Sequence, residues 1–289
     1  MEIGRVSEAL EMYPALRRTA RGMMAGTTKE DAVAEAVKLN WRGFGVSLEF
    51  VGDVPADERE AGEAANEHLR LIGMLGVAGR SATIALDPAR VGLKLGREVA
   101  SRQLDRLLGE AAIYGLSIVI GAEADDHADD ALELYRNASE RYASASVGIA
   151  LHADRERTAS DLAEIGPCPG RIKIVQGSRR GDGQGNSDGP KEKVLELIGT
   201  AASSGRPVTI ASHDESLLRE AGKRGVFARP NAEAELPYGI RSDLAEKLMR
   251  EGVRTRIQLP YGTEWHLFLS RRLSEAALGP DSVIAGFRS

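Results

Sequence analysis

The sequence predicts a single-domain (β/α)8 barrel with an N-terminal helical extension. Eight short apolar or β-branched runs, between residues 46 and 259, alternate with longer helical patterns. This alternation is typical of a closed parallel barrel. An open doubly wound sheet is the alternative, but no Gly-x-Gly-x-x-Gly motif follows any of the runs, so a dinucleotide fold loses its main support.

The predicted strands are bounded by turn residues and by amphipathic segments. In chain order they are VSLEF (46–50), ATIAL (82–86), SIVIG (117–121), VGIAL (147–151), RIKIV (171–175), PVTIAS (207–212), VFARP (226–230) and TRIQL (255–259). The intervening segments include REVASRQLDRLLGEAAIYG and KEKVLELIGTAASSG. Both end in glycine, the residue that commonly follows the last turn of a helix.

An N-terminal helical segment and one Gly-rich loop complete the predicted organisation of the chain. Residues 5–40 have a helical pattern and precede the first strand, so they either cap the bottom of the barrel or pack on its side. We therefore divide the chain into an N-terminal helical segment, 1–40, and a barrel, 41–289. The Gly-rich segment 177–190 follows the fifth strand, and it is either a lid or a disordered surface loop.

Composition narrows the classes of function. A net charge of -5 gives no general attraction to nucleic acid or to an anionic membrane. The single cysteine, Cys168, cannot form an intramolecular disulfide and does not suffice for a Cys-based zinc site. The N-terminus has no apolar signal region, and no stretch approaches the ~18 apolar residues that span a bilayer. We predict a cytoplasmic protein without a membrane span, and we leave its oligomeric state open.

Polar residues lie at or just after the predicted strands, where barrel enzymes place their reactive groups. These residues are Glu49, Asp87, Glu123, His152, Asp154, Gln176, His213, Asp214, Arg229 and Gln258. His152 and Glu123 are the candidates for acid–base catalysis. We predict no metal site, because the strands that carry His152 and His213 are not adjacent in the expected order. The alternative for each residue is a loop position or a helix cap.

The last helical segment carries two adjacent arginines, Arg271 and Arg272, near the aromatic residues Trp265 and Phe268. Guanidinium groups bind a carboxylate with two parallel hydrogen bonds, and aromatic rings form the wall of a small pocket. An amino-acid carboxylate is therefore the first ligand to consider. The alternative is a solvated helix face on which Arg271 pairs with Glu275.

Several motifs match one enzyme family. They are LEFVGD (48–53), TIALDPARVGL (83–93), IGAEA (120–124), LHADRERTASDL (151–162), IKIVQG (172–177), SHD (212–214), YGIR (238–241) and PYGTEWHLFLSRRLSE (260–275). In this order and spacing the chain resembles the flavin-dependent proline dehydrogenases from about Gly26 to Glu275. The final block is the most specific part of the resemblance.

The resemblance implies a (β/α)8 barrel with FAD lying across the carboxyl ends of the strands. It implies hydride transfer from proline or a related amino acid to the flavin. The substrate side would comprise Arg271 and Arg272 on the carboxylate, together with Phe268 and Gln258. The cofactor side would comprise the positions that match the family's flavin-facing motifs. These are His152, Lys173, Gln176, Gly177, His213 and Glu275.

The chain departs from the family pattern at several of these positions. The family's second-strand lysine is Ala85, its strand-end aspartate is Gly121, and its flavin-side arginine is Lys173. Its eighth-strand tyrosine is Gln258, which makes the expected pocket more polar. An alternative function follows, in which the barrel has lost FAD. It would then act as a non-redox enzyme through His152, Glu123 or Asp154, or as a carboxylate-binding protein.

Overall fold

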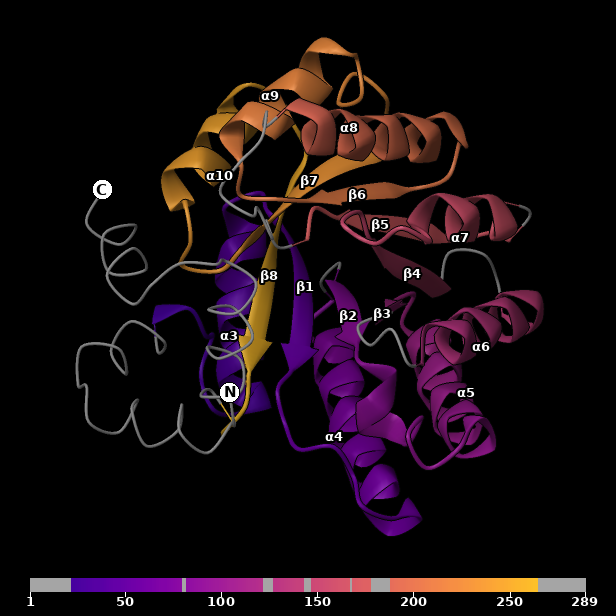
Figure 1. Cartoon of the computed structure of the whole chain (residues 1–289). Helices are drawn as coiled ribbons and strands as arrows, with labels where there is room; N and C mark the ends of the chain where they lie inside the picture. The colour runs from indigo at the N-terminus through magenta and orange to yellow at the C-terminus, as the bar shows by residue number, and fades with distance from the viewer. Residues whose placement is uncertain are drawn as a thin grey trace, which may run out of the picture.

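The protein is a closed barrel of eight parallel strands, as predicted (Figure 1). The computed structural model describes residues 22–79, 82–121, 127–142, 147–166, 168–177 and 188–264. Each strand pairs with the next along the chain, and β8 closes the barrel against β1. The strands are β1 (Gly45–Phe50), β2 (Ala82–Leu86), β3 (Ser117–Gly121), β4 (Val147–His152), β5 (Arg171–Val175), β6 (Val208–Ala211), β7 (Ala232–Pro237) and β8 (Thr255–Tyr261).

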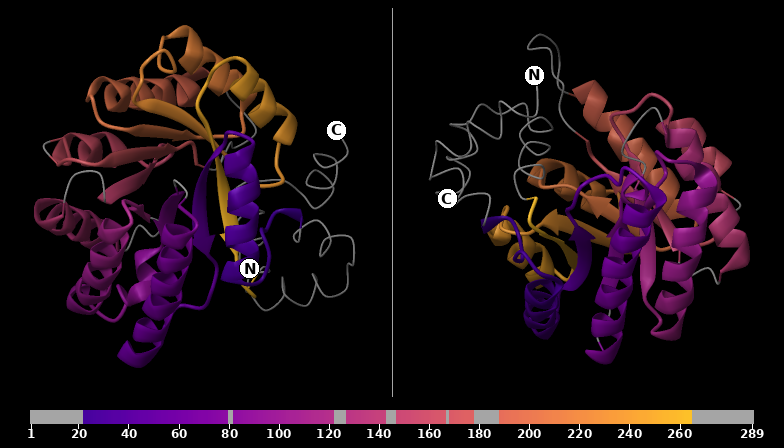
Figure 2. Two further views of the ribbon diagram at one scale, coloured as in Figure 1. Left: turned by 180° about the vertical axis from the view of Figure 1, so that it is seen from behind. Right: turned by 90° about the horizontal axis from the view of Figure 1, so that it is seen from below.

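Helices surround the barrel on its outside, as the two further views show (Figure 2). They are α3 (Lys29–Trp41), α4 (Glu58–Val77), the 3-10 turn η1 (Pro88–Val91), α5 (Arg97–Ile113), α6 (Ala128–Arg141), α7 (Thr158–Glu164), α8 (Asp188–Ser203), α9 (Glu215–Lys223) and α10 (Ser242–Arg250). Helix α3 packs on the side of the barrel against β1 and β8. None of the described helices has the length and apolar character needed to cross a bilayer. The division of the chain at residue 40 stays a prediction.

The prediction of the seventh strand was wrong. Residues 226–230 form turns, and β7 begins at Ala232, after Pro230. Pro230 offers no N–H to a neighbouring strand, and the pairing of β7 with β6 begins only beyond it, at Ala232. Arg229 consequently lies at the opposite end of β7 from the candidate site, where its Nη1 donates to the carbonyl of Ala202 at 3.2 Å.

The strands separate an apolar outer face from a polar inner one. Alternate residues such as Val46, Leu48, Ile172 and Ile174 are almost fully buried and pack in the apolar core. The residues between them point to the other face of the sheet, because side chains alternate along a strand. That inner face carries Ser47, Glu49, Arg171 and Lys173, among other polar residues. Layers of branched apolar residues fill most barrels of this kind, so the polar lumen is unusual.

Candidate active site

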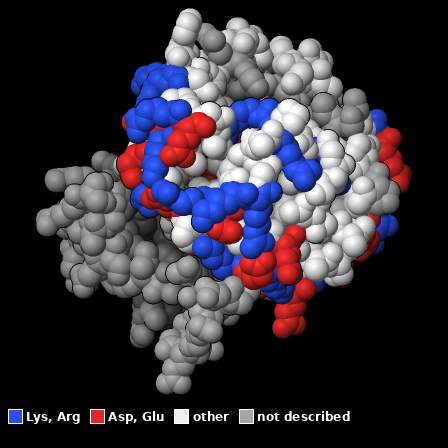
Figure 3. Space-filling model, turned by 90° about the horizontal axis from the view of Figure 1, so that it is seen from above, with Lys and Arg blue, Asp and Glu red and all other residues white. Residues whose placement is uncertain are grey.

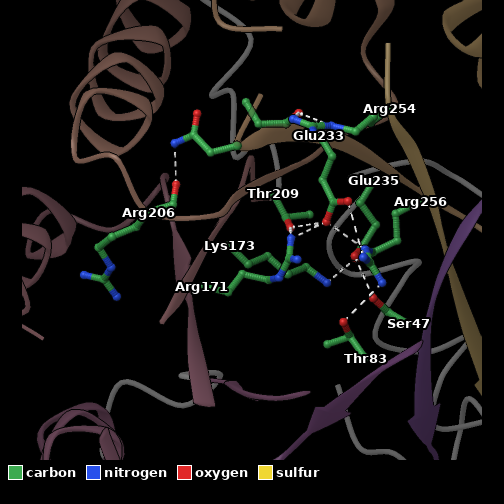
Figure 4. Close-up of polar contacts among 12 residues, drawn as sticks. Ser47, Thr83, Arg171, Lys173, Arg206, Thr209, Glu233, Glu235, Arg254 and Arg256 are labelled. Atoms are coloured by element: carbon green, nitrogen blue, oxygen red, sulfur yellow. Dashed lines mark hydrogen bonds and ion pairs between the residues drawn. The ribbon is translucent and has the colours of Figure 1, made fainter. Parts of the chain in front are cut away.

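The deeper layer of the lumen is a network centred on Glu233 of β7 (Figure 4). The guanidinium of Arg256 donates to both carboxylate oxygens, from Nε at 2.7 Å and from Nη2 at 3.3 Å. Arg171 of β5 also donates to Glu233, and Thr209 donates to it at 2.8 Å. The Nη1 of Arg256 reaches the carbonyl of Val46 at 2.6 Å, which links β8 and β7 to β1.

Burial and charge act in opposite directions in this layer. Burial alone would raise the pKa of Glu233, but the guanidinium groups of Arg256 and Arg171 outweigh it and hold the pKa below its usual value. Burial lowers the pKa of Arg171, which still keeps its charge at neutral pH. The absence of a side chain at Gly45 makes room for the Arg256 guanidinium, since a Cβ there would lie 3.3 Å from its Cζ.

The layer above it, closer to the carboxyl ends of the strands, contains an ion pair between Lys173 of β5 and Glu235 of β7. One carboxylate oxygen of Glu235 contacts the ammonium, and the other accepts a hydrogen bond from Ser47 of β1 at 2.9 Å. All three side chains are buried, with exposed fractions of 7% for Lys173 and 2% for Glu235. The pair spans the lumen, because β6 lies between β5 and β7.

Gln258 of β8 lies next to Glu49 of β1. The Gln258 Nε2 donates to the Glu49 carboxylate at 2.6 Å, and Glu49 is 5% exposed. The predicted substrate-facing residue is therefore joined to a buried carboxylate that was singled out independently as a strand-end residue. Together they make this part of the lumen polar, as the glutamine in place of tyrosine suggested.

A third group of side chains joins the ends of β5 and β6. Gln176 accepts a hydrogen bond from the Ser212 hydroxyl at 2.5 Å and donates to Asp214 at 3.5 Å. Asp214 also caps α9 by accepting from the backbone N–H of Ser216 at 2.9 Å. Burial would raise the pKa of Asp214, but these hydrogen bonds outweigh it and hold the pKa below its usual value.

The remaining described candidates also lie at the carboxyl ends of the strands. His152 is the half-buried last residue of β4, and His213 follows β6 and is exposed. Gly177 follows β5 with a φ of +82°, and a Cβ on it would lie 2.2 Å from the Asp154 carboxylate carbon. Both its backbone conformation and this close approach require glycine.

A cavity of about 170 Å³ opens at the ends of β2 and β3. Its lining includes Asp87, Gly121 and Lys94, with His127 at the start of α6. His127 directly precedes α6, and its Nδ1 lies 3.5 Å from an Asp130 carboxylate oxygen. His68 of α4 is buried against the ring of Phe50, and its Nδ1 lies 2.8 Å from the Ala64 carbonyl oxygen.

Five predicted site residues lie outside the described part of the chain. They are Glu123, Phe268, Arg271, Arg272 and Glu275. Their roles stay predictions. Across the ranges that the structure describes, no group of three or more His, Cys, Asp or Glu side chains is arranged to hold a metal ion.

The charged lumen was not predicted from the sequence. Glu233, Glu235 and Arg256 were not singled out, and neither was Ser47. The sequence nevertheless indicates it, because charged or polar residues alternate with apolar ones in AEAELP, TRIQLP and RIKIV. A strand buried on both faces is expected to be apolar throughout, so alternating charge inside a barrel indicates side chains that pair across the lumen.

The outer surface over α9 and α10 is also rich in charge (Figure 3). Glu215 accepts from Arg219 at 2.9 Å, from Arg241 at 3.0 Å and from Lys247 at 2.6 Å. These cations lower the pKa of Glu215 to about 2. Arg241, in the YGIR motif, thus connects α10 to α9 at the surface and has a positive φ of 49°.

The fold and the site define a class of protein: a (β/α)8 barrel whose lumen carries paired charges and whose candidate residues lie at the carboxyl ends of the strands. No protein-family model matches the chain. Comparison with curated proteins confirms the resemblance found in the sequence. The chain is 26% identical to proline dehydrogenase 1 of Bacillus subtilis, over 93% of this chain and 91% of that protein.

A second relative is proline dehydrogenase of Deinococcus radiodurans, at 25% identity over 92% of this chain and 89% of that protein. Among solved structures, proline utilization A (PutA) of Bdellovibrio bacteriovorus matches with a TM-score of 0.79 at 14% identity. The match covers 92% of this chain but 33% of that one, so this chain spans about a third of the PutA protein. PutA of Bradyrhizobium japonicum matches with a TM-score of 0.74.

Proposed function

We propose that this protein is an FAD-dependent oxidoreductase that oxidises the C–N bond of proline or a related amino acid. The observation that carries the proposal is the similarity to proline dehydrogenases, which extends over nine tenths of both chains. The barrel geometry supports it, because the candidate residues share the end of the barrel at which enzymes of this fold bind their substrates. The location we propose is the cytoplasm.

The residues on the cofactor side are compatible with a flavin. A lysine ammonium has three hydrogen-bond donors, and the Glu235 carboxylate is the partner that the structure gives to Lys173. Lys173 therefore has donors to spare for carbonyl or nitrogen acceptors of the flavin ring. Gln176 and Gly177 directly follow β5, His152 is the last residue of the neighbouring β4, and His213 follows the neighbouring β6. Bound FAD would supply the two-electron acceptor.

On the substrate side, we propose that Arg271 and Arg272 bind the carboxylate of the amino acid, with Phe268 as the adjacent wall. Gln258 and Glu49 would contact the ring or the nitrogen of the substrate. Clamping the carboxylate orients the C–H bond toward the flavin, which is the positioning that hydride transfer requires. Bound FAD would accept the hydride from the carbon; the nitrogen would lose its proton to solvent, and an imine would be left.

The visible spectrum of the purified protein tests the cofactor. We expect flavin absorbance, either as isolated or after incubation with excess FAD and removal of the unbound flavin. The Lys173→Met variant should retain less flavin than the wild type. Arg219→Ala, which removes an exposed cation from α9, is a matched control and should retain as much flavin as the wild type.

A colourless protein that takes up no FAD would overturn the redox function and favour the alternative of a non-redox or carboxylate-binding barrel. In that case proline and other carboxylate ligands should still raise the melting temperature of the wild type. They should not raise that of Arg271→Ala, since the clamp would be lost.

A further inference from the structure

The ion pair of Lys173 and Glu235, in the upper layer of the lumen, supports an inference that goes beyond the proposed function and rests on it. Lys173 lies at the position where the proposed flavin site needs a cation. The structure sets a carboxylate directly against it, from Glu235 on β7 (Figure 4). The pair is neutral as a whole, so the charge presented to a ligand above it depends on both residues.

Glu235 is held in a fixed place. One of its oxygens contacts Lys173, and its other oxygen accepts from the Ser47 hydroxyl at 2.9 Å. With 2% of its surface exposed, it is shielded from water and counter-ions. A charge pair in such surroundings acts over several ångströms much more strongly than it does in water.

We propose that Glu235 is a positioning residue that orients the Lys173 ammonium and cancels its charge at the flavin site. The consequence concerns the flavin reduction potential. Two-electron reduction adds negative charge to a flavin, and a nearby uncompensated cation would favour that state. By neutralising Lys173, Glu235 keeps the potential of the bound flavin lower than the lysine alone would set it.

The test is an anaerobic redox titration of the FAD-loaded protein. The wild type is compared with two single variants, with their double variant and with a control variant. Glu235→Gln should raise the midpoint potential, because the cation is left uncompensated. Lys173→Met should lower it, because the carboxylate is left uncompensated. The double variant, Lys173→Met with Glu235→Gln, should return toward the wild-type value, because it too is neutral.

Glu233→Gln is the matched control, since it makes the same change on the same strand two residues deeper in the lumen. It removes a carboxylate from Arg171 and Arg256 and perturbs the barrel, but it should shift the potential much less than Glu235→Gln. A purely structural role would move both glutamate variants alike. It would also give no opposite signs for the lysine and glutamate variants.

The outcomes are distinguishable. If the wild type takes up no FAD, the proposed function fails and this inference fails with it. If FAD binds but Glu235→Gln and Lys173→Met shift the potential in the same direction, the inference alone is overturned. Should Glu235→Gln not fold, the lowering by Lys173→Met and its reversal in the double variant still decide the matter.

Discussion

Glu233→Gln tests whether the charged layer stabilises the barrel. Glutamine keeps the shape of the side chain and one carbonyl oxygen, but it removes the charge that compensates Arg171 and Arg256. Its NH2 group would also face the Arg256 Nη2, which now donates to a carboxylate oxygen at 3.3 Å. Breaking a buried ion pair from one side costs about 3–5 kcal/mol. Domains are stable by roughly 5–15 kcal/mol, so we expect a weakened but folded variant.

The loss should depend on pH with a definite sign. The pKa of Glu233 is lowered in the folded state from its usual 4.5, so its contribution is complete above that value. The contribution is lost as the pH falls through the folded pKa, because the protonated carboxyl then resembles the amide. Urea unfolding at several pH values should therefore show a difference between wild type and variant that narrows on acidification below 4.5.

Glu215→Gln is the control. Glu215 also contacts three cations, but it lies on the surface of the protein, where water and salt screen the interaction. The loss of stability caused by Glu215→Gln should be smaller than that caused by Glu233→Gln, and it should decrease with added salt. If Glu233→Gln costs no more than Glu215→Gln, or if its cost does not change on acidification, the network does not stabilise the barrel as argued.

Two further predictions concern single contacts. Gly239→Ala should cost more than Gly205→Ala in the same urea assay. Gly239 and Gly205 have similar positive φ angles, 72° and 75°, a conformation that costs other residues about 1–3 kcal/mol. Their surroundings differ, because a Cβ on Gly239 would lie 2.1 Å from the Gly22 carbonyl oxygen, whereas a Cβ on Gly205 would have no atom within 4 Å. Equal costs would contradict that close approach. Burial raises the pKa of Tyr135 from 10.0 to about 12, so the neutral phenol stabilises the folded state, and this stabilisation is lost as the pH rises from about 10 through about 12. Tyr135→Phe should abolish this alkaline loss of stability. An unchanged alkaline profile would show that Tyr135 does not cause the loss.

The fold followed from the sequence wherever strands are rich in β-branched residues. ATIAL and SIVIG, for example, correspond to β2 and β3 at the predicted residues. The seventh strand was missed because AEAELP consists mainly of alanine and glutamate, which are poor strand formers. Packing in the closed sheet overrides that weak local preference, so the strand could not be located from its own residues.

The candidate site was predictable in its location but not in its pairings. His152 ends β4 and Gln176 directly follows β5, where the barrel prediction put them, whereas Gln258 lies inside β8, which runs on to Tyr261. The contact of Lys173 with Glu235 joins residues 62 positions apart. It depends on the register of three strands and on which side chains share the lumen. Alternation within one strand gives the direction of a side chain but not its partner across the barrel.

We propose that this barrel passes electrons from an amino acid to a bound flavin. Anaerobic mixing of the FAD-loaded protein with proline, followed by the visible flavin absorbance, tests it most directly. We expect proline, or a related amino acid in its place, to bleach the flavin, and we expect Arg271→Ala to need a far higher concentration of the same amino acid. If dithionite bleaches the bound flavin while proline and related amino acids leave it oxidised, the account is contradicted.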